Sequence, residues 1–316
     1  MGLGRYSFRA MGSPCALHLY GGSRSELDAM AARAQELVLA LERKYSRYRD
    51  DSVLSALNRS AGDAAGVEVD AETADLLDYA DTAFRHSGGL FDPSSGALRR
   101  AWNFRSGRVP SQAELHEVLG CVGWARVRWA RPRLVLPVPG MELDFGGFVK
   151  EYAVDRVTDL CRELGVRGGM VDLGGDLRAI GPHPDGRPWI VGIRDPRAPE
   201  RAIRSVPLAC AALATSGDYE RCMVVDGVRY THILDPRTGW PVSGLASASV
   251  VAPQCLVAGT ATTIALLSGE RGGARFLDGL GLPNLRVDAR GRVSGSLASA
   301  GSSGRCAADA RPGPAA

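Results

Sequence analysis

The spacing of apolar residues predicts a chain that mixes strands and helices from its start. Residues 8–20 alternate apolar and polar positions, which predicts a strand, and Met11-Gly12 interrupts it. Apolar residues then recur at helical spacing through residues 23–48, where Ser23 and Glu26 match a capping box. We therefore expect a sheet to open the fold and an amphipathic helix to follow it.

The same patterns predict most of the remaining elements. A second helix is expected from the N-cap Asp70 to Gly88-Gly89, and a third from Ser111, where Glu114 completes a capping box. Asp226-Gly227 is a hairpin turn sequence. Further helices are expected at residues 149–164 and 256–267, and strands at residues 124–129, 133–138, 141–145, 170–173, 189–194, 208–214, 222–230 and 247–252. Residues 288–294 carry another turn, at Arg290-Gly291.

Composition excludes several classes of protein. The formal charge of +3 comes from 38 basic and 35 acidic residues without a basic run, so we expect no nucleic-acid partner. No apolar stretch approaches the ~20 residues that span a bilayer, so an integral membrane protein is not expected either. Arg5 and Arg9 precede no apolar signal region, which favours a cytoplasmic location.

Cysteine and histidine positions argue against a zinc site. The seven cysteines are scattered without a C-x-x-C pair, and His18, His86, His116 and His183 lack metal-ligand spacing. No G-x-S-x-G sequence occurs, so a serine hydrolase also fits poorly.

We expect one folded unit over residues 1–297. From residue 298 the chain is nearly all Ala, Gly, Ser, Pro and Arg, which buries too little apolar surface to offset the entropy of ordering. Residues 298–316 are therefore predicted to be a disordered tail.

A glycine turn beside charged residues is the first candidate for chemistry. Asp144-Phe-Gly-Gly147 precedes a predicted helix, whose free N–H groups favour an anion, and Lys150 adds a positive charge one turn later. This combination suits a pyrophosphate. Taken alone, the same residues also fit a tight turn with Lys150 as a solvated surface residue.

A second polar cluster surrounds a predicted hairpin. Ser216-Gly-Asp-Tyr219 and the segment from His232 through Asp235 to Gly239 place a hydroxyl, a histidine and two carboxylates near one another. His232 could act as a general base near pH 7, or it could be a structural histidine.

The order and wording of these segments resemble the ApbE family, whose members transfer FMN from FAD to a threonine or serine of an acceptor protein. The resemblance covers about residues 8–269 and implies an α+β fold of mixed sheets flanked by helices, with an FAD cleft between two lobes. The matching segments are Ala10-Met-Gly-Ser13, Tyr48-Arg-Asp-Asp-Ser52 with Asn58, Gly89-Leu-Phe-Asp-Pro93, Asp144-Phe-Gly-Gly-Phe-Val-Lys150, Tyr152-Ala-Val-Asp155, Asp172-Leu-Gly-Gly-Asp176, Ser216-Gly-Asp-Tyr-Glu220 and His232-Ile-Leu-Asp-Pro-Arg-Thr-Gly239.

The resemblance also implies roles for individual residues. His232 would help to deprotonate the acceptor hydroxyl, with Asp235 as a second catalytic residue. The residues that would bind FAD are Met11, Tyr48, Leu90, Phe91, Asp92, Asp144, Lys150, Ser216, Gly217 and Asp218.

The implied magnesium site departs from the family pattern. The family holds the ion through a backbone carbonyl at the position of Gly147 and through an Asp and a Thr of an A-D-A-x-x-T segment. Here that segment is Ala258-Gly-Thr-Ala-Thr-Thr263, so Thr263 is retained but Gly259 stands at the position of the Asp. Losing a charged ligand lowers affinity roughly 10- to 150-fold, unless Asp235 or another nearby carboxylate compensates.

Three functions are therefore compatible with the sequence. The first is an FMN transferase that cleaves FAD and releases AMP. The second is a diverged enzyme that keeps the nucleotide pocket and acts on a small molecule. The third is a flavin-binding protein without turnover.

Overall fold

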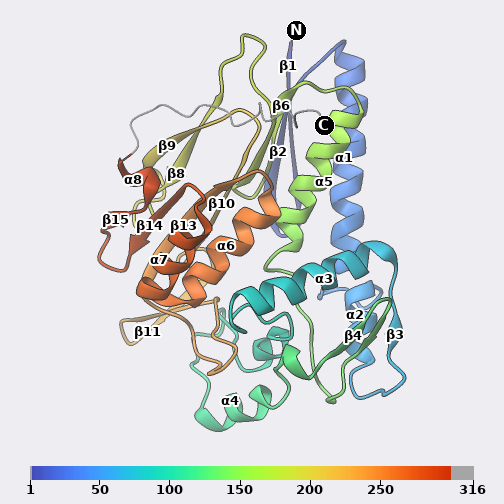
Figure 1. Cartoon of the computed structure of the whole chain (residues 1–316), viewed down its shortest axis with the longest axis vertical. Coiled ribbons are helices and arrows are strands. Elements are labelled where there is room, and N and C mark those ends of the chain that lie inside the picture. Colours follow the sequence, from blue (N-terminus) through green and yellow to red (C-terminus); the bar gives the residue numbers. More distant parts are fainter. Residues whose placement is uncertain (1, 300–316) are drawn as a thin grey trace, which may run out of the picture.

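An eight-stranded antiparallel sheet organises the computed structural model, which describes residues 2–299 (Figure 1). Each neighbouring pair of strands in it is antiparallel. The strands follow the order β1 (Leu3–Ala10), β2 (Ser13–Tyr20), β6 (Gly168–Leu173), β7 (Asp176–Gly181), β10 (Ala212–Gly217), β13 (Leu245–Ala252), β14 (Asn284–Asp288) and β15 (Val293–Ser294).

Helices cover one face of this sheet. α1 (Arg24–Tyr45) packs against α5 (Val149–Glu163), which packs in turn against α6 (Cys255–Leu267). Figure 1 shows these three helices side by side, and α7 (Gly269–Leu280) follows α6. Their apolar stripes form the main core with alternate residues of the strands, such as Leu17 and Val250.

A hairpin covers the opposite face. β8 (Trp189–Arg194) and β9 (Ala202–Leu208) pack Trp189 and Val206 against Leu177 and Leu213 of the sheet, in a second apolar cluster. The central strands are therefore buried on both faces, and little of the large sheet is left for chemistry except at its ends.

A smaller region lies below the large sheet in Figure 1. Part of it packs around Trp102 and Leu115 in a separate hydrophobic cluster, whereas Leu57 and Leu77 belong to the main core. Its elements are α2 (Val53–Arg59), α3 (Ala71–His86), the 3₁₀ turns at Gly96–Arg100 and Trp124–Arg126, α4 (Gln112–Leu119), and a three-stranded sheet of β3 (Val67–Glu68), β5 (Arg133–Val135) and β4 (Arg128–Ala130). The hairpin of β11 (Cys222–Val225) and β12 (Val228–Thr231) adjoins this cluster through Met223.

Locally encoded features of the sequence are found where they were predicted. Ser23 and Glu26 form a complete capping box at α1, and Ser111 does so at α4. Asp70 caps α3. The Asp226-Gly227 turn joins β11 to β12 with positive φ at both residues, as this tight hairpin turn requires.

Several predicted strands differ in extent from those of the structure, and one of them is absent there. Residues 208–214 are divided between the end of β9 and the start of β10, and residues 124–129 begin as a 3₁₀ turn. Residues 141–145 are not a strand, although Met141, Leu143 and Phe145 alternate inward as in one. The Asn58 side chain satisfies the backbone of Leu143, and single contacts with Ser95 and Pro93 replace the ladder of a neighbouring strand.

The C-terminal prediction falls largely outside the described residues. Ala298 and Ser299 belong to the short helix α8 (Ser296–Ser299), and residues 300–316 are not among those described. None of the helices in residues 2–299 combines the length and the apolar content that crossing a bilayer requires.

Candidate active site

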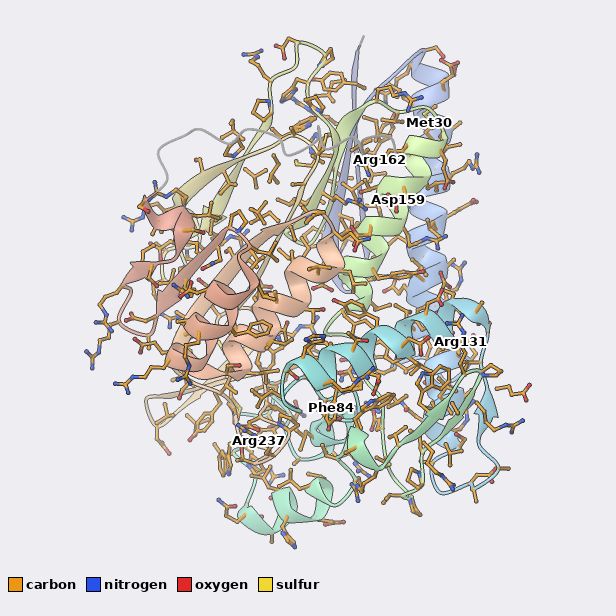
Figure 2. All side chains as sticks on the ribbon, in the orientation of Figure 1. Met30, Phe84, Arg131, Asp159, Arg162 and Arg237 are labelled. Atoms are coloured by element: carbon orange, nitrogen blue, oxygen red, sulfur yellow. The ribbon has the colours of Figure 1, made fainter. Side chains whose placement is uncertain are left out.

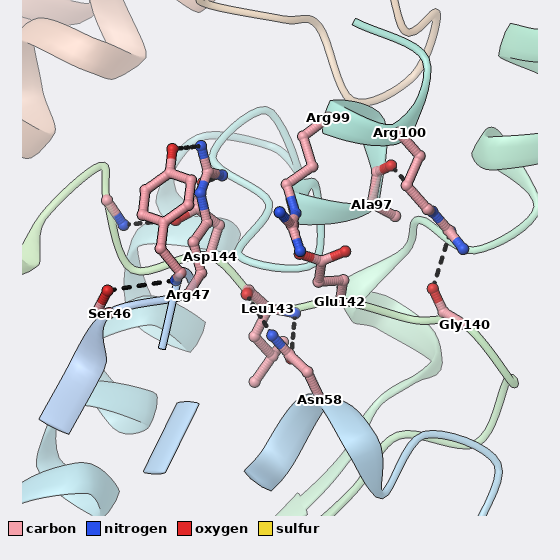
Figure 3. A network of polar contacts seen from close by, with 12 residues as sticks. Ser46, Arg47, Asn58, Ala97, Arg99, Arg100, Gly140, Glu142, Leu143 and Asp144 are labelled. Carbon is pink, nitrogen blue, oxygen red and sulfur yellow. Dashed lines mark hydrogen bonds and ion pairs between the residues drawn. The ribbon is translucent and has the colours of Figure 1, made fainter. Parts of the chain in front are cut away.

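Asn58 holds the segment that leads into the glycine turn. Its side-chain amide donates to the Leu143 carbonyl (3.0 Å) and accepts from the Leu143 N–H (2.7 Å), as Figure 3 shows. Next to this clamp, Arg47 forms an ion pair with Asp144, whose other oxygen accepts the Gly146 N–H at 2.8 Å. Asp144 is thereby held at the mouth of the turn (Figure 3).

The glycine turn starts α5 as predicted. Within residues 2–299 no side chain caps the helix at Phe148, so N–H groups of its first turn remain available for an anion. Phe91 packs beside the turn. A Cβ atom built onto Gly147 would lie 3.7 Å from the Phe91 ring. The Leu90–Asp92 segment and the glycine turn, predicted to serve one ligand, are thus neighbours.

Lys150 is not the solvated surface residue that the sequence alone allowed. Its ammonium group lies 2.6 Å from a carboxylate oxygen of Asp176, whose side chain is almost fully buried. Burial works against the charged form, but the Asp176 carboxylate raises the pKa of Lys150 above its ordinary value. The Lys150 ammonium group is therefore held by Asp176 at the start of β7 and is only partly exposed to solvent.

Glu151, the next residue, was missed by the sequence analysis. It is 7% exposed, and its burial together with the nearby Asp176 carboxylate raises its pKa above the ordinary value. A signal was available in the sequence, since Glu151 and Asp155 stand four residues apart and share the face of α5 with the apolar Val154. Charged residues at helical spacing on a buried face call for a partner.

The threonine-rich turn of α6 meets β10. The Ser216 hydroxyl lies 2.8 Å from the Thr262 hydroxyl and 3.3 Å from that of Thr263, and Thr262 also donates to the Gly259 carbonyl at 2.8 Å. Gly259 is buried, and a Cβ atom built onto it would lie 2.5 Å from Cγ of Glu151. The predicted residues Ser216 and Thr263 are therefore together, next to the departure at Gly259.

His232 has one ring nitrogen engaged. Its Nδ1 lies 3.0 Å from the Arg221 carbonyl, which can only accept, so Nδ1 carries the proton and Nε2 keeps its lone pair. Burial above all lowers the pKa of His232 to about 4. The charges of Arg221 and Arg47 act in the same direction, whereas the hydrogen bond to the Arg221 carbonyl and the Asp144 carboxylate raise the pKa. The imidazole is therefore neutral at pH 7, and it shares its surroundings with Asp144.

The first hairpin approaches the same place. Met11 adopts a positive φ of 51° and its N–H donates to Glu42, while a Cβ atom on Gly12 would lie 3.7 Å from the Arg221 guanidinium. A left-handed non-glycine residue is uncommon and marks sites that the surrounding structure holds in place. Tyr48 is 73% exposed, with Arg47 over its ring, and is free to stack on a planar ligand.

Three predicted carboxylates are engaged in holding loops. Asp92 accepts from Ser94 and from the Trp124 N–H, and Asp218 receives two hydrogen bonds of 2.7 Å from Arg197. Gly217 lies between Ser216 and Asp218 at the end of β10. Asp235 is bound by Arg237, which Figure 2 shows in the loop below the large sheet. These contacts shape the site but leave the carboxylates little capacity for a ligand.

The oxygen atoms around the turn suit a hard cation. The Gly147 carbonyl and the half-buried Thr263 hydroxyl are the donor types that Mg²⁺ prefers, and Glu151 Oε2 is buried without a hydrogen-bond partner in residues 2–299. No cluster of three or more His, Cys, Asp or Glu in that range could hold a metal by itself. The residues present thus fit an oxygen-coordinated ion with few protein ligands.

Comparisons with known proteins agree with this arrangement. An FAD:protein FMN transferase of Treponema pallidum is 34% identical over 82% of this chain and 77% of its own, and one of Klebsiella pneumoniae is 32% identical over 86% and 84%. The ApbE protein of Thermotoga maritima superposes with a TM-score of 0.87 at 31% identity, covering 93% of this chain and 97% of its own. The flavin transferase ApbE from Vibrio cholerae gives 0.84 at 26%, covering 94% and 98%.

The match extends over the whole site. The model of the ApbE family covers residues 11–285, from the Met11 turn through the hairpin of His232 to the strand that follows α7. With relatives above 30% identity over most of the chain, this coverage leaves one assignment: the chain belongs to the ApbE family.

Proposed function

We propose that this chain is an FAD:protein FMN transferase, which cleaves the pyrophosphate of FAD, joins the FMN phosphate to a threonine or serine hydroxyl of an acceptor protein and releases AMP. The observation that carries the proposal is the neutral His232 beside Asp144 and the glycine turn of α5. Its relatives bear the name of this activity.

His232 is suited to remove the proton of the acceptor hydroxyl. With Nδ1 donating to Arg221, Nε2 is free to accept that proton, and the low pKa keeps it unprotonated at neutral pH. The oxygen then attacks the phosphorus of the FMN half, and the bond to the AMP half breaks. His232 rather than Asp235 would do this, because Arg237 occupies the Asp235 carboxylate.

Phosphoryl transfer depends mainly on positioning and charge neutralisation. The uncapped start of α5 offers N–H groups to the diphosphate, and Lys150 adds a positive charge at the same turn. Met11, Tyr48 and the Leu90–Phe91 segment would contact the flavin and adenine ends, in a cleft between the large sheet and the smaller region. Mg²⁺, held by the Gly147 carbonyl and Thr263, would neutralise charge on the phosphates.

One observation favours a second function. Gly259 stands where the family pattern has an acidic residue, so a diverged member that binds FAD without transferring FMN to protein, or that acts on a small molecule, is the alternative.

A transfer assay decides between them. The protein is mixed with FAD, Mg²⁺ and an acceptor that carries a flavinylation sequence, and AMP release and a fluorescent acceptor band are measured. Both products support the transferase, whereas bound FAD without AMP supports the alternative. We expect His232→Ala to lower transfer about 10²- to 10⁴-fold with FAD affinity nearly unchanged. The exposed His116→Ala in α4 is the matched control.

A further inference from the structure

Gly259 does not leave an empty space in the buried site. A Cβ atom built onto it would lie 2.5 Å from Cγ of Glu151 and 2.9 Å from both Cδ and Oε1. The Glu151 side chain, arriving from α5, therefore fills the volume that any side chain on this turn of α6 would enter. A carboxylate at position 259 and the carboxylate of Glu151 exclude each other and occupy the same region.

The Glu151 carboxylate is incompletely satisfied. The residue is 7% exposed, and Oε2 is buried without a hydrogen-bond partner among residues 2–299. Leaving a buried polar oxygen unpaired is costly, and most such atoms in native proteins have a partner. An unpaired carboxylate oxygen at this place calls for a donor or a cation.

The acidic groups that flank Glu151 on α5 and β7 already have cations. Lys150 pairs with Asp176, and Asp155 pairs with Arg178 at 3.0 Å. Glu151 has no ion pair among the described residues. A cation next to Glu151 would give its carboxyl group the partner that these two groups have.

The hydroxyl groups of α6 frame the same place. Thr260 is engaged by the Tyr79 hydroxyl at 2.9 Å, and Thr262 is engaged by Gly259 and Ser216. Thr263 is half-buried and lies one turn after Gly259, and among residues 2–299 its hydroxyl has only the longer 3.3 Å contact to Ser216. It is the hydroxyl of this turn with capacity for a further interaction.

We propose that Glu151 supplies from α5 the cation-binding carboxylate that position 259 of α6 lacks, so that a hard divalent cation binds with Glu151, Thr263 and the Gly147 carbonyl as its protein ligands. The role of the ion in catalysis rests on the proposed function, whereas the binding of the ion does not depend on it. The acidic ligand has moved to the neighbouring helix while its place in the site is kept. Glu151 matches the oxygen preference of Mg²⁺, for which Mn²⁺ is a spectroscopic substitute.

The test measures Mn²⁺ binding to the full chain by the loss of the free-ion EPR signal, with and without FAD. We expect Glu151→Gln to weaken binding about 10-fold or more, because the charged ligand is lost while the shape is kept. Glu163→Gln, at the exposed end of the same helix, should leave binding unchanged. Circular dichroism and thermal unfolding show whether each variant is folded.

A relocation variant sharpens the test. Combining Glu151→Gly with Gly259→Asp moves the carboxylate back to α6, and we expect Mn²⁺ affinity within a few-fold of the original chain. Any of three results would overturn the inference. Glu151→Gln could bind Mn²⁺ as tightly as the original chain, or the folded relocation variant could fail to regain affinity. The third such result is that the original chain binds no Mn²⁺ with or without FAD.

The two proposals fail differently. If AMP is released and the acceptor is labelled, but Glu151→Gln leaves Mn²⁺ affinity unchanged, the inference is wrong and the transferase proposal stands. If Mn²⁺ binding depends on Glu151 but FAD is neither bound nor cleaved, the site is real and the proposed function is wrong.

Discussion

Helices α5 and α6 pack side by side on the same sheet, yet their compositions are opposite. The first two turns of α5 carry Lys150, Glu151 and Asp155, whereas Cys255–Leu267 of α6 contains no charged residue. The polar atoms that α6 brings to the shared interface are hydroxyls and backbone groups. The charge of this interface therefore comes from one helix alone.

The difference shows that the acidic group next to Gly259 comes from the neighbouring helix and not from α6 itself. The carboxylate of Glu151 lies where a residue at 259 would place its own, so the site is not vacated by the glycine. The dependence extends to folding, because the Asp155 carboxylate accepts the N–H groups of Cys255 and Leu256, both at 2.9 Å. α5 thus provides the N-terminal cap that α6 lacks in its own sequence.

The largest expected effect comes from removing that cap. Asp155→Ala leaves two N–H groups of α6 unbonded and takes a buried partner from Arg178, so we expect a loss of about 3 to 5 kcal/mol in the free energy of unfolding. Urea denaturation measures it. Asp159→Ala, on the exposed side of α5, should cost within about 1 kcal/mol. A loss for Asp155→Ala no greater than that of the control would show that α6 does not depend on α5.

A smaller effect tests the close approach at Gly259. Gly259→Ala introduces a Cβ atom against Glu151 and should destabilise the chain by about 1 to 3 kcal/mol. Glu151→Ala in the same chain should relieve the clash, giving a coupling of about 0.5 to 3 kcal/mol in a double-mutant cycle.

Gly279→Ala in α7 is the matched control, because nothing lies within 4 Å of the added atom. It should stabilise the helix by about 0.5 to 1 kcal/mol. Additive effects of Gly259→Ala and Glu151→Ala would mean that the two residues do not share one space.

The smallest effect concerns a hydroxyl that joins the smaller region to α6. The hydroxyl of Tyr79 on α3 lies 3.1 Å from the Leu256 carbonyl and 2.9 Å from the Thr260 hydroxyl, and it can donate to either. Tyr79→Phe should therefore lower the free energy of unfolding by about 1 kcal/mol, as measured by thermal unfolding. Tyr6→Phe removes an exposed hydrogen bond to Asp28 and should change stability by less than about 0.5 kcal/mol. If Tyr79→Phe and Tyr6→Phe change stability equally, the Tyr79 hydroxyl does not stabilise α6.

The sequence by itself determined the features that depend on a few neighbouring residues. Capping boxes at Ser23 and Ser111 and the turn at Asp226-Gly227 are encoded within four residues, because helix caps and tight turns satisfy backbone groups locally. The motifs in family order were likewise sufficient for the ApbE assignment.

Only the tertiary structure decided what these residues face. Residues 141–145 have the alternation of a strand, but the partner of the Leu143 backbone is the Asn58 side chain, which no local pattern reveals. The pairing of Lys150 with Asp176 and the overlap of Glu151 with Gly259 depend on how α5 packs against the sheet and α6. Contacts between distant segments are set by packing, which the sequence does not show. Gly259 looks like a lost ligand in the sequence, but in the fold the Glu151 side chain fills the space next to it.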